Sequence, residues 1–208
     1  MREAAARETR RRIRTAAADL FVASGYAATS MRAIAAAAGV SERTVFLAFP
    51  TKAALLGECV RVAIRGGDED TALLARDRMR AVLDAPPERM LGLLADASAE
   101  LMGRAARLLA VGESVGPDDP VLNEVRERGR AATRSDMLEV APGDATRRCA
   151  GGGDVRGGGG GSAVLAASES VYIRLVHHQG RSPEDYARML ERALAGALWA
   201  ERRAGDPP

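Results

Sequence analysis

The 208-residue sequence has few cysteines and no long apolar run. Its two cysteines, Cys59 and Cys149, lie far apart without paired spacing, which excludes a disulfide framework or a zinc site built on them. No apolar run approaches the roughly 20 residues that span a bilayer. The arginine-rich start is not followed by the apolar core of a signal peptide. We therefore expect a cytoplasmic protein with no membrane partner.

The chain also lacks the residue patterns of a catalytic or metal site. His177 and His178 are adjacent, so on a helix they point about 100° apart, and no carboxylate cluster joins them. No serine, cysteine or lysine nucleophile has a base at a recognisable spacing. We expect a protein that is not an enzyme and that binds neither a metal nor a cofactor.

A glycine-rich segment, residues 151–161, has eight glycines in eleven positions. It contains neither the lysine nor the serine or threonine of a phosphate-binding loop, so its composition predicts a flexible linker. Two other interpretations stay open. The segment is either a mobile flap over a ligand pocket or the product of a shifted reading frame, because GC-rich coding yields glycine and arginine in wrong frames.

Positive charge is concentrated at the amino-terminal end. The net charge is +2, but residues 1–65 carry +6 and residues 66–208 carry −4. A basic end of this kind favours DNA binding. Six arginines precede or open the first expected helix, and they form either a solvated face or a mobile arm that reaches the phosphates or the minor groove: Arg2, Arg7, Arg10, Arg11, Arg12 and Arg14.

Residues 29–55 predict two short helices joined by a glycine turn and followed by a third helix. A helix over 31–38 places Ile34, Ala35 and Ala38 on one apolar face. Gly39 ends it, because glycine enters the left-handed conformation without steric penalty, and Ser41 can cap the next helix. This pattern, at about residues 31–49, is typical of a helix-turn-helix that presents its second helix to a DNA groove.

The second helix is expected to have an inner face of Val45, Phe46 and Phe49 and an outer face of Arg43, Thr44, Leu47 and Ala48. Arg43 is the candidate for a guanine contact, and Leu47 or Ala48 for a thymine methyl group.

Pro50 closes the second helix, and Thr51 can cap a third that begins at Lys52. Lys52 is the only lysine in the chain. Because its ammonium lies beside free helix-terminal amides, the position favours a phosphate contact.

Many positions between Arg10 and Leu56 stand at the spacing of a known domain. They are Ala17, Leu20, Phe21, Gly25, Tyr26, Thr29, Ser30, Ile34, Ala35, Gly39, Val40, Ser41, Thr44, Phe49, Pro50 and Lys52. Together they resemble the DNA-binding domain of TetR-family transcriptional regulators. An alanine-rich helical hairpin within some other helical protein is the alternative.

The resemblance implies an all-α fold with two domains: a TetR-type helix-turn-helix DNA-binding domain over residues 1–65 and a helical ligand-binding and dimerisation domain over residues 66–208. With the helix pattern, it gives these candidate DNA-binding residues: Thr29, Ser30, Arg32, Ser41, Arg43, Thr44, Phe46, Leu47, Ala48 and Lys52.

Some positions depart from the family pattern. Phe46 stands where the family usually has a tyrosine that reaches a phosphate, and Leu47 and Ala48 stand where polar residues are common. Ala33 replaces the acidic residue of a capping box, so the helix after Ser30 should start less firmly. The outward face is therefore expected to be unusually apolar.

The remainder predicts further helices, at about Thr51–Arg65, Glu69–Leu83, Pro87–Val111 and Pro120–Val140, separated by glycine and proline. Apolar side chains within Pro87–Val111 are candidates for an effector pocket: Met90, Leu93, Leu94, Met102 and Leu108. Core packing explains these residues equally well.

Two last helices are expected over Ala163–His178 and Pro183–Arg203, with Ser182 as the cap of the second. In the resembled family such a pair packs against its copy as a four-helix bundle, although ordinary core is the alternative. The candidate dimer residues are Val171, Tyr172, Leu175, Tyr186, Met189, Leu190, Ala193 and Leu198.

The function that follows is sequence-specific transcriptional regulation. We expect a homodimeric repressor that binds a double-stranded DNA operator and is released by an unknown small-molecule effector. Two alternative functions stay open: a helical ligand-binding module whose DNA binding has degenerated, and an uncharacterised helical enzyme.

Overall fold

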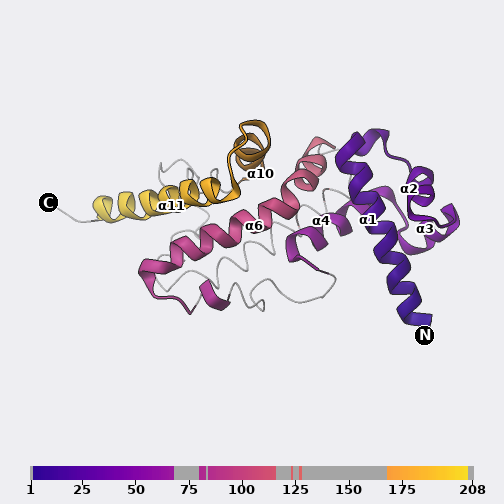
Figure 1. The fold of residues 1–208 in the computed structure, drawn as a ribbon, viewed down its shortest axis with the longest axis horizontal. Coiled ribbons are helices and arrows are strands. Elements are labelled where there is room, and N and C mark those ends of the chain that lie inside the picture. The colour runs from indigo at the N-terminus through magenta and orange to yellow at the C-terminus, as the bar shows by residue number, and fades with distance from the viewer. Residues whose placement is uncertain are drawn as a thin grey trace. The chain divides into compact units, whose positions relative to one another are not determined.

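The structure is a computed structural model that describes residues 2–67, 80–82, 84–115, 123, 127 and 168–205. The elements formed by these residues are all helical, which confirms the predicted all-α class (Figure 1). They are α1 (Arg2–Ala28), α2 (Met31–Ala38), α3 (Glu42–Ala48), α4 (Lys52–Arg65), α6 (Pro87–Ser114), α10 (Glu169–Tyr172), the π-helix η2 (Ile173–His178) and α11 (Pro183–Gly205).

By packing, the chain divides into two units. The first takes in the described residues of Met1–Asp68 and Arg107–Ala131, and the second those of Glu69–Ala106 and Ala132–Pro208. The division at residue 65 that the sequence suggests stays a prediction.

The first unit is built on a buried stripe of α1. Ile13, Ala17 and Phe21 recur at every fourth residue, so they lie on one face of the helix, and all three are fully buried. Helix α1 contacts α2 and α4, and α2 contacts α3. The side chains that complete this core are Met31, Ile34, Ala35, Ala38, Val45, Phe49, Ala53, Leu55, Leu56, Cys59 and Leu108.

Helix α1 begins at Arg2 and includes the arginine-rich leader. The leader is therefore helical from Arg2 onward, which favours the solvated face over the mobile arm. A kink at Gly25, where φ is 79° and ψ is 169°, ends the regular part of the helix before α2.

Three hydroxyls cap the next helices. The side-chain oxygens of Ser30, Ser41 and Thr51 each accept a hydrogen bond from the amide three residues on, at 3.1, 3.1 and 3.0 Å. Gly39 and Gly66, with φ of 64° and 69°, end α2 and α4 in the left-handed conformation. The predicted stops and starts of the helix-turn-helix are thereby confirmed.

In the second unit, two tyrosines pack on the small residues of α6. The rings of Tyr172 and Tyr186 meet edge to face, with centroids 4.9 Å apart. They lie in one buried cluster with Ala95, Ala99 and Ala106 of α6 and with Ala187 and Leu190 of α11. Small side chains on α6 let the aromatic rings approach closely.

The carboxy-terminal helices differ in part from prediction. Ser168 is extended and caps α10, so that helix begins at Glu169 and not at Ala163. Residues 173–178 form a π-helix, which the sequence pattern did not predict. The predicted start of α11 is confirmed, because Ser182 and Asp185 cap each other's amides at 3.2 and 3.3 Å.

Several predicted segments fall wholly or partly outside the described residues. These are residues 163–167, Glu69–Leu83 apart from the helical residues 80–82, Pro120–Val140 apart from 123 and 127, and the glycine-rich segment 151–161 with Cys149.

Candidate DNA-recognition surface

Helix α3 has a buried face and an exposed face. Val45 and Phe49 are buried against α1 and α2 in the core of the first unit. Arg43 is exposed, Leu47 is 77% exposed and Phe46 is 47% exposed. The expectation that Phe46 packs beside Val45 on the inner face is therefore wrong. One helical step of about 100° carries Phe46 out of the core.

Three of the predicted polar site residues support the backbone. Ser41 and Thr44 hydroxyls lie 2.7 Å apart at the start of α3, where Ser41 also caps the helix. Thr29 is 3% exposed, and its hydroxyl lies 2.8 Å from the Gly25 carbonyl. These hydroxyls fix the entry to α2 and α3 from within the unit.

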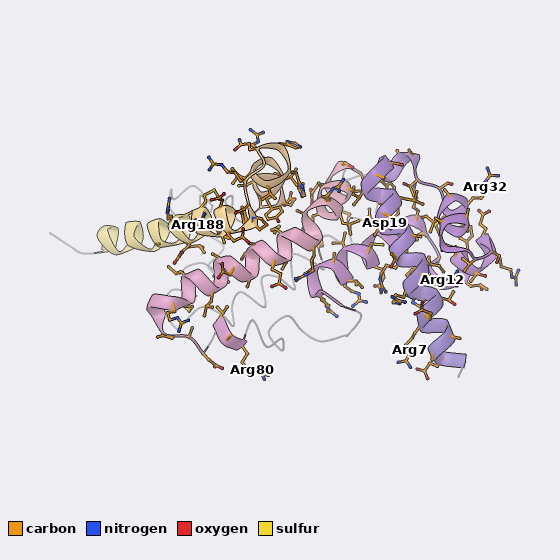
Figure 2. All side chains as sticks on the ribbon, viewed as in Figure 1. Arg7, Arg12, Asp19, Arg32, Arg80 and Arg188 are labelled. Atoms are coloured by element: carbon orange, nitrogen blue, oxygen red, sulfur yellow. The ribbon has the colours of Figure 1, made fainter. Side chains whose placement is uncertain are left out.

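Two other candidates lie at the surface of α2. Ser30, the cap of α2, is exposed, and so is Arg32. Figure 2 shows the Arg32 side chain pointing away from the α2 ribbon. Both are therefore accessible to a phosphate.

Lys52 ties the start of α4 to the end of α1. Its ammonium donates to the carbonyls of Tyr26 and Thr29 at 2.8 and 2.9 Å and lies 4.2 Å from the centroid of the Tyr26 ring. Burial lowers the pKa of Lys52 below its ordinary value. An ammonium has three N–H donors, so these two bonds leave one for a partner outside the protein.

Two arginines of α1 reach the ends of α2 and α3, a role the sequence pattern did not indicate. Arg10 donates to the Ala48 carbonyl at 2.5 Å, and its guanidinium lies 4.2 Å from the centroid of the Phe49 ring. Arg12 donates to the carbonyls of Ala38 and Gly39 at 2.5 and 3.3 Å. Contacts that join residues 26 and 38 positions apart leave no periodic signal.

The thiol of Cys59 is enclosed in the first unit. Its sulfur lies 3.5 Å from the Arg14 carbonyl, and burial raises the pKa of the thiol to about 12. The thiol therefore stays protonated at neutral pH.

The five candidate pocket residues lie along α6. Met90, Leu93 and Leu94 are half-buried, and Met102 packs against the tyrosine cluster of the second unit. Leu108 is buried in the core of the first unit. The structure therefore assigns Met102 and Leu108 to different clusters.

The candidate dimer residues divide into buried and half-buried ones. Tyr172, Tyr186 and Leu190 are buried within a single chain. The half-buried ones are Val171, Leu175, Met189 and Ala193, while the side chain of Leu198 lies outside those described. A groove of about 330 Å³ on this unit is lined by Leu175, Arg181, Asp185, Tyr186, Arg188, Met189 and Arg192.

Within the described part of the chain, no group of three histidine, cysteine or acidic side chains could hold a metal ion. His177 and His178 are both exposed. Among the described helices, none combines the length and the apolar character needed to cross a membrane.

Comparisons with known proteins agree with this geometry. Residues 13–59 match the family described as bacterial regulatory proteins, tetR family. None of the curated proteins matches the chain.

Solved structures with the same fold include three regulators, each covering most of both chains. NalD from Pseudomonas aeruginosa, the secondary repressor of the MexAB-OprM multidrug efflux pump, is 24% identical with a TM-score of 0.62, over 91% of this chain and 95% of NalD. A transcriptional regulator from Rhodococcus sp. Rha1 is 21% identical with a TM-score of 0.67, over 92% and 96%. A protein described as a TetR-family regulator from Mesorhizobium loti is 23% identical with a TM-score of 0.60, over 94% and 97%.

The matched residues 13–59 contain the capped α2–turn–α3 pair and its supporting core. Residues 13–59 of the chain therefore form a domain of the bacterial regulatory proteins of the tetR family, and the rest of the chain shares the fold of the solved regulators.

Proposed function

We propose that this chain is a homodimeric repressor of an operator with approximate two-fold symmetry. Each protomer places α3 in the major groove, and the two α3 helices enter successive grooves about 34 Å apart. The observation that carries this proposal is the exposed face of α3, on which Arg43, Phe46 and Leu47 stand on a helix with both ends fixed.

The same face suggests how bases are read. A guanidinium can donate to two acceptors of guanine, so Arg43 is proposed to read that base. Phe46, Leu47 and Ala48 offer only apolar surface, which suits the methyl group of thymine. Helix α3 has no asparagine or glutamine to read adenine.

Phosphate contacts are proposed for groups at the rim of this face. Ser30 and Arg32 are exposed on α2, and Lys52 retains one N–H donor. Ser41, Thr44 and Thr29 are proposed to act by holding the helix starts in place. The excess positive charge of residues 1–65 would attract any duplex, whatever its sequence.

Repression is proposed from the likeness to NalD, which is described as a repressor. Release by a small molecule is proposed from the resemblance to TetR-family regulators. The effector would bind the second unit, in the domain proposed for residues 66–208, and the dimer seam would lie on α10, η2 and α11. Coupling between effector and operator would be about 1 to 3 kcal/mol, the usual range for allosteric regulators.

The experiment that tests the function is a mobility shift with the DNA beside the gene, together with selection from randomised duplexes. We expect retardation of one partly palindromic sequence and its release by a small molecule from a ligand panel. Failure to select any sequence would contradict the proposal and favour a ligand-binding module with degenerate DNA reading, for which Phe46, lacking a phosphate-binding hydroxyl, is the motivating residue.

A further inference from the structure

The carboxy-terminal ends of α2 and α3 are the parts of the helix-turn-helix with the least internal support. The last carbonyls of a helix have no intrahelical donor and carry partial negative charge. Helices of eight and seven residues are marginal by themselves, so tertiary contacts must set their directions. Whatever holds these carbonyl ends fixes the angle at which α3 meets DNA.

A single helix holds both ends. Arg12 of α1 donates to the last carbonyls of α2, at Ala38 and Gly39, and Arg10 of α1 donates to the last carbonyl of α3, at Ala48. Figure 2 labels Arg12 on α1 in the first unit. Each arginine supplies a positive charge where the helix dipole is negative, in addition to a hydrogen bond.

Arg10 has further partners that restrict its position. Its guanidinium lies 4.2 Å from the centroid of the Phe49 ring, the residue that ends α3. The positive charge of Arg10 also contributes to lowering the pKa of Glu58 on α4, after the larger effect of the hydrogen bond from Arg61. Through Ala48 and Phe49, Arg10 joins α1 to the end of α3.

We propose that Arg10 and Arg12 are positioning residues for DNA recognition, which clamp the carboxy-terminal ends of α3 and α2 to α1 and so set the angle of the base-reading face. This inference rests on the proposed function. It gives a specific role to two arginines of a basic leader that otherwise suggests a phosphate-binding arm. Loss of a phosphate contact lowers the affinity for every duplex alike. Loss of the clamp lowers the affinity for the operator more than the affinity for an unrelated duplex.

The test uses the full-length protein with Arg10→Met and Arg12→Met, which keep an apolar stem but remove the charge and the donors. Arg7→Met is the matched control, because Arg7 is exposed on the same helix and the charge removed is the same. Affinity is measured for the selected operator and for an unrelated duplex of equal length across a salt series. Thermal melts correct each value for the unfolded fraction.

We expect each clamp variant to lose about tenfold in operator affinity, which corresponds to about 1.4 kcal/mol. Its affinity for the unrelated duplex should fall no more than that of Arg7→Met, so the ratio of the two affinities falls only in the clamp variants. Arg12→Lys, which keeps a charge and a donor, should recover part of the ratio. Equal losses on both duplexes, with a salt slope reduced by about one, would identify a phosphate contact and overturn the inference.

A second measurement needs no DNA. Amide hydrogen exchange should accelerate in α2 for Arg12→Met and in α3 for Arg10→Met, while α4 stays at the wild-type rate. If the wild-type protein selects no operator, the proposed function fails, and the exchange rates still decide whether the clamp exists. Unchanged exchange in α2 and α3 would overturn the clamp even if an operator is found.

Discussion

At the scale of single residues, the proposed base reading would depend on few side chains, because the exposed face of α3 is small. Arg43 is its only basic residue. We predict that Arg43→Ala weakens operator binding by about 1 to 3 kcal/mol and relaxes the preference at one base pair, because one bidentate contact to guanine is lost. Selection from randomised duplexes measures both effects. An unchanged base preference at every position would show that Arg43 does not read a base.

The apolar part of the face leads to a different test. Leu47 is 77% exposed and Phe46 is 47% exposed, and burial of either on DNA requires an apolar group on the base. We predict that deoxyuridine in place of thymidine weakens binding by about 0.8 kcal/mol per buried methyl. The contacted thymine is found by scanning the operator one thymine at a time in a binding assay.

Leu47→Ala provides the cross-check for that experiment. In this variant, replacing thymidine by deoxyuridine should weaken binding less than in the wild type, because the side chain that covers the methyl group is truncated. Equal costs in both proteins would assign the methyl contact to another residue.

Residue roles were predictable only where they depend on sequence neighbours. The caps at Ser30, Ser41 and Thr51 are local signals, and all three are present. The exposure of Phe46 and the carbonyl contacts of Arg10 depend on how α1 packs on the other helices. No pattern within one helix carries that information.

At the scale of elements, the turn between α2 and α3 restricts its glycine in two ways. Gly39 has φ of 64°, and a Cβ there would lie 2.8 Å from the Arg12 Nη2 atom. We predict that Gly39→Ala lowers the free energy of unfolding by about 1 to 2 kcal/mol, the cost of the left-handed conformation for an L residue. Denaturant unfolding measures it.

Gly112→Ala is the matched control for the turn. Gly112 lies inside α6, and a Cβ there would meet nothing within 4 Å. Alanine is the better helix former by about 0.8 to 1.0 kcal/mol, so this variant should gain stability. Losses of similar size at both glycines would contradict a special role for the turn.

The packing of α11 on α6 includes an unpaired polar atom. Among the described residues, the buried Tyr186 hydroxyl has no hydrogen-bond partner, and burial raises its pKa to about 12. We predict that Tyr186→Phe raises the free energy of unfolding by about 1 kcal/mol, because an unsatisfied buried group is removed while the ring stays. Thermal or denaturant unfolding provides the measurement.

Tyr186→Ala separates the ring from the hydroxyl. It should lower the free energy of unfolding by about 3 to 5 kcal/mol, as loss of a large buried ring does. A destabilised Tyr186→Phe would indicate that the hydroxyl has a partner in the folded protein.

The helices themselves were largely predictable, and the exceptions have local causes. Helices α2, α4 and α11 begin where predicted, because their sequences have strong periodicity and clear start and stop residues. The π-helix at 173–178 keeps apolar residues at nearly helical spacing, so the pattern cannot distinguish it from an α-helix. Helix α10 starts late because the Ser168 hydroxyl caps the amide of Val171.

At the scale of the whole molecule, charge is distributed unevenly along the chain. The excess positive charge belongs to residues 1–65, and residues 66–208 are net negative. The end of α6 returns to the first unit, where Leu108 is buried. The burial of Leu108 in this core depends on packing between residues far apart in the sequence, so composition alone could not predict it.

In the proposed mechanism, two DNA-binding domains held together bind a two-fold operator, so dimer formation would control affinity. Met189 of α11 is half-buried beside the tyrosine cluster. A charged side chain at this position would therefore disrupt the proposed dimer interface without being buried in the core of the protomer. We predict that Met189→Glu sediments as a monomer and binds the two-site operator about 100-fold more weakly, because the second site no longer binds at high effective concentration. A duplex with one half-site should bind wild type and variant equally, which controls for damage to the DNA-binding domain.

A variant that still sediments as a dimer would exclude Met189 from the dimer interface. A wild-type protein that is monomeric while it binds the full operator tightly would contradict the dimeric mechanism.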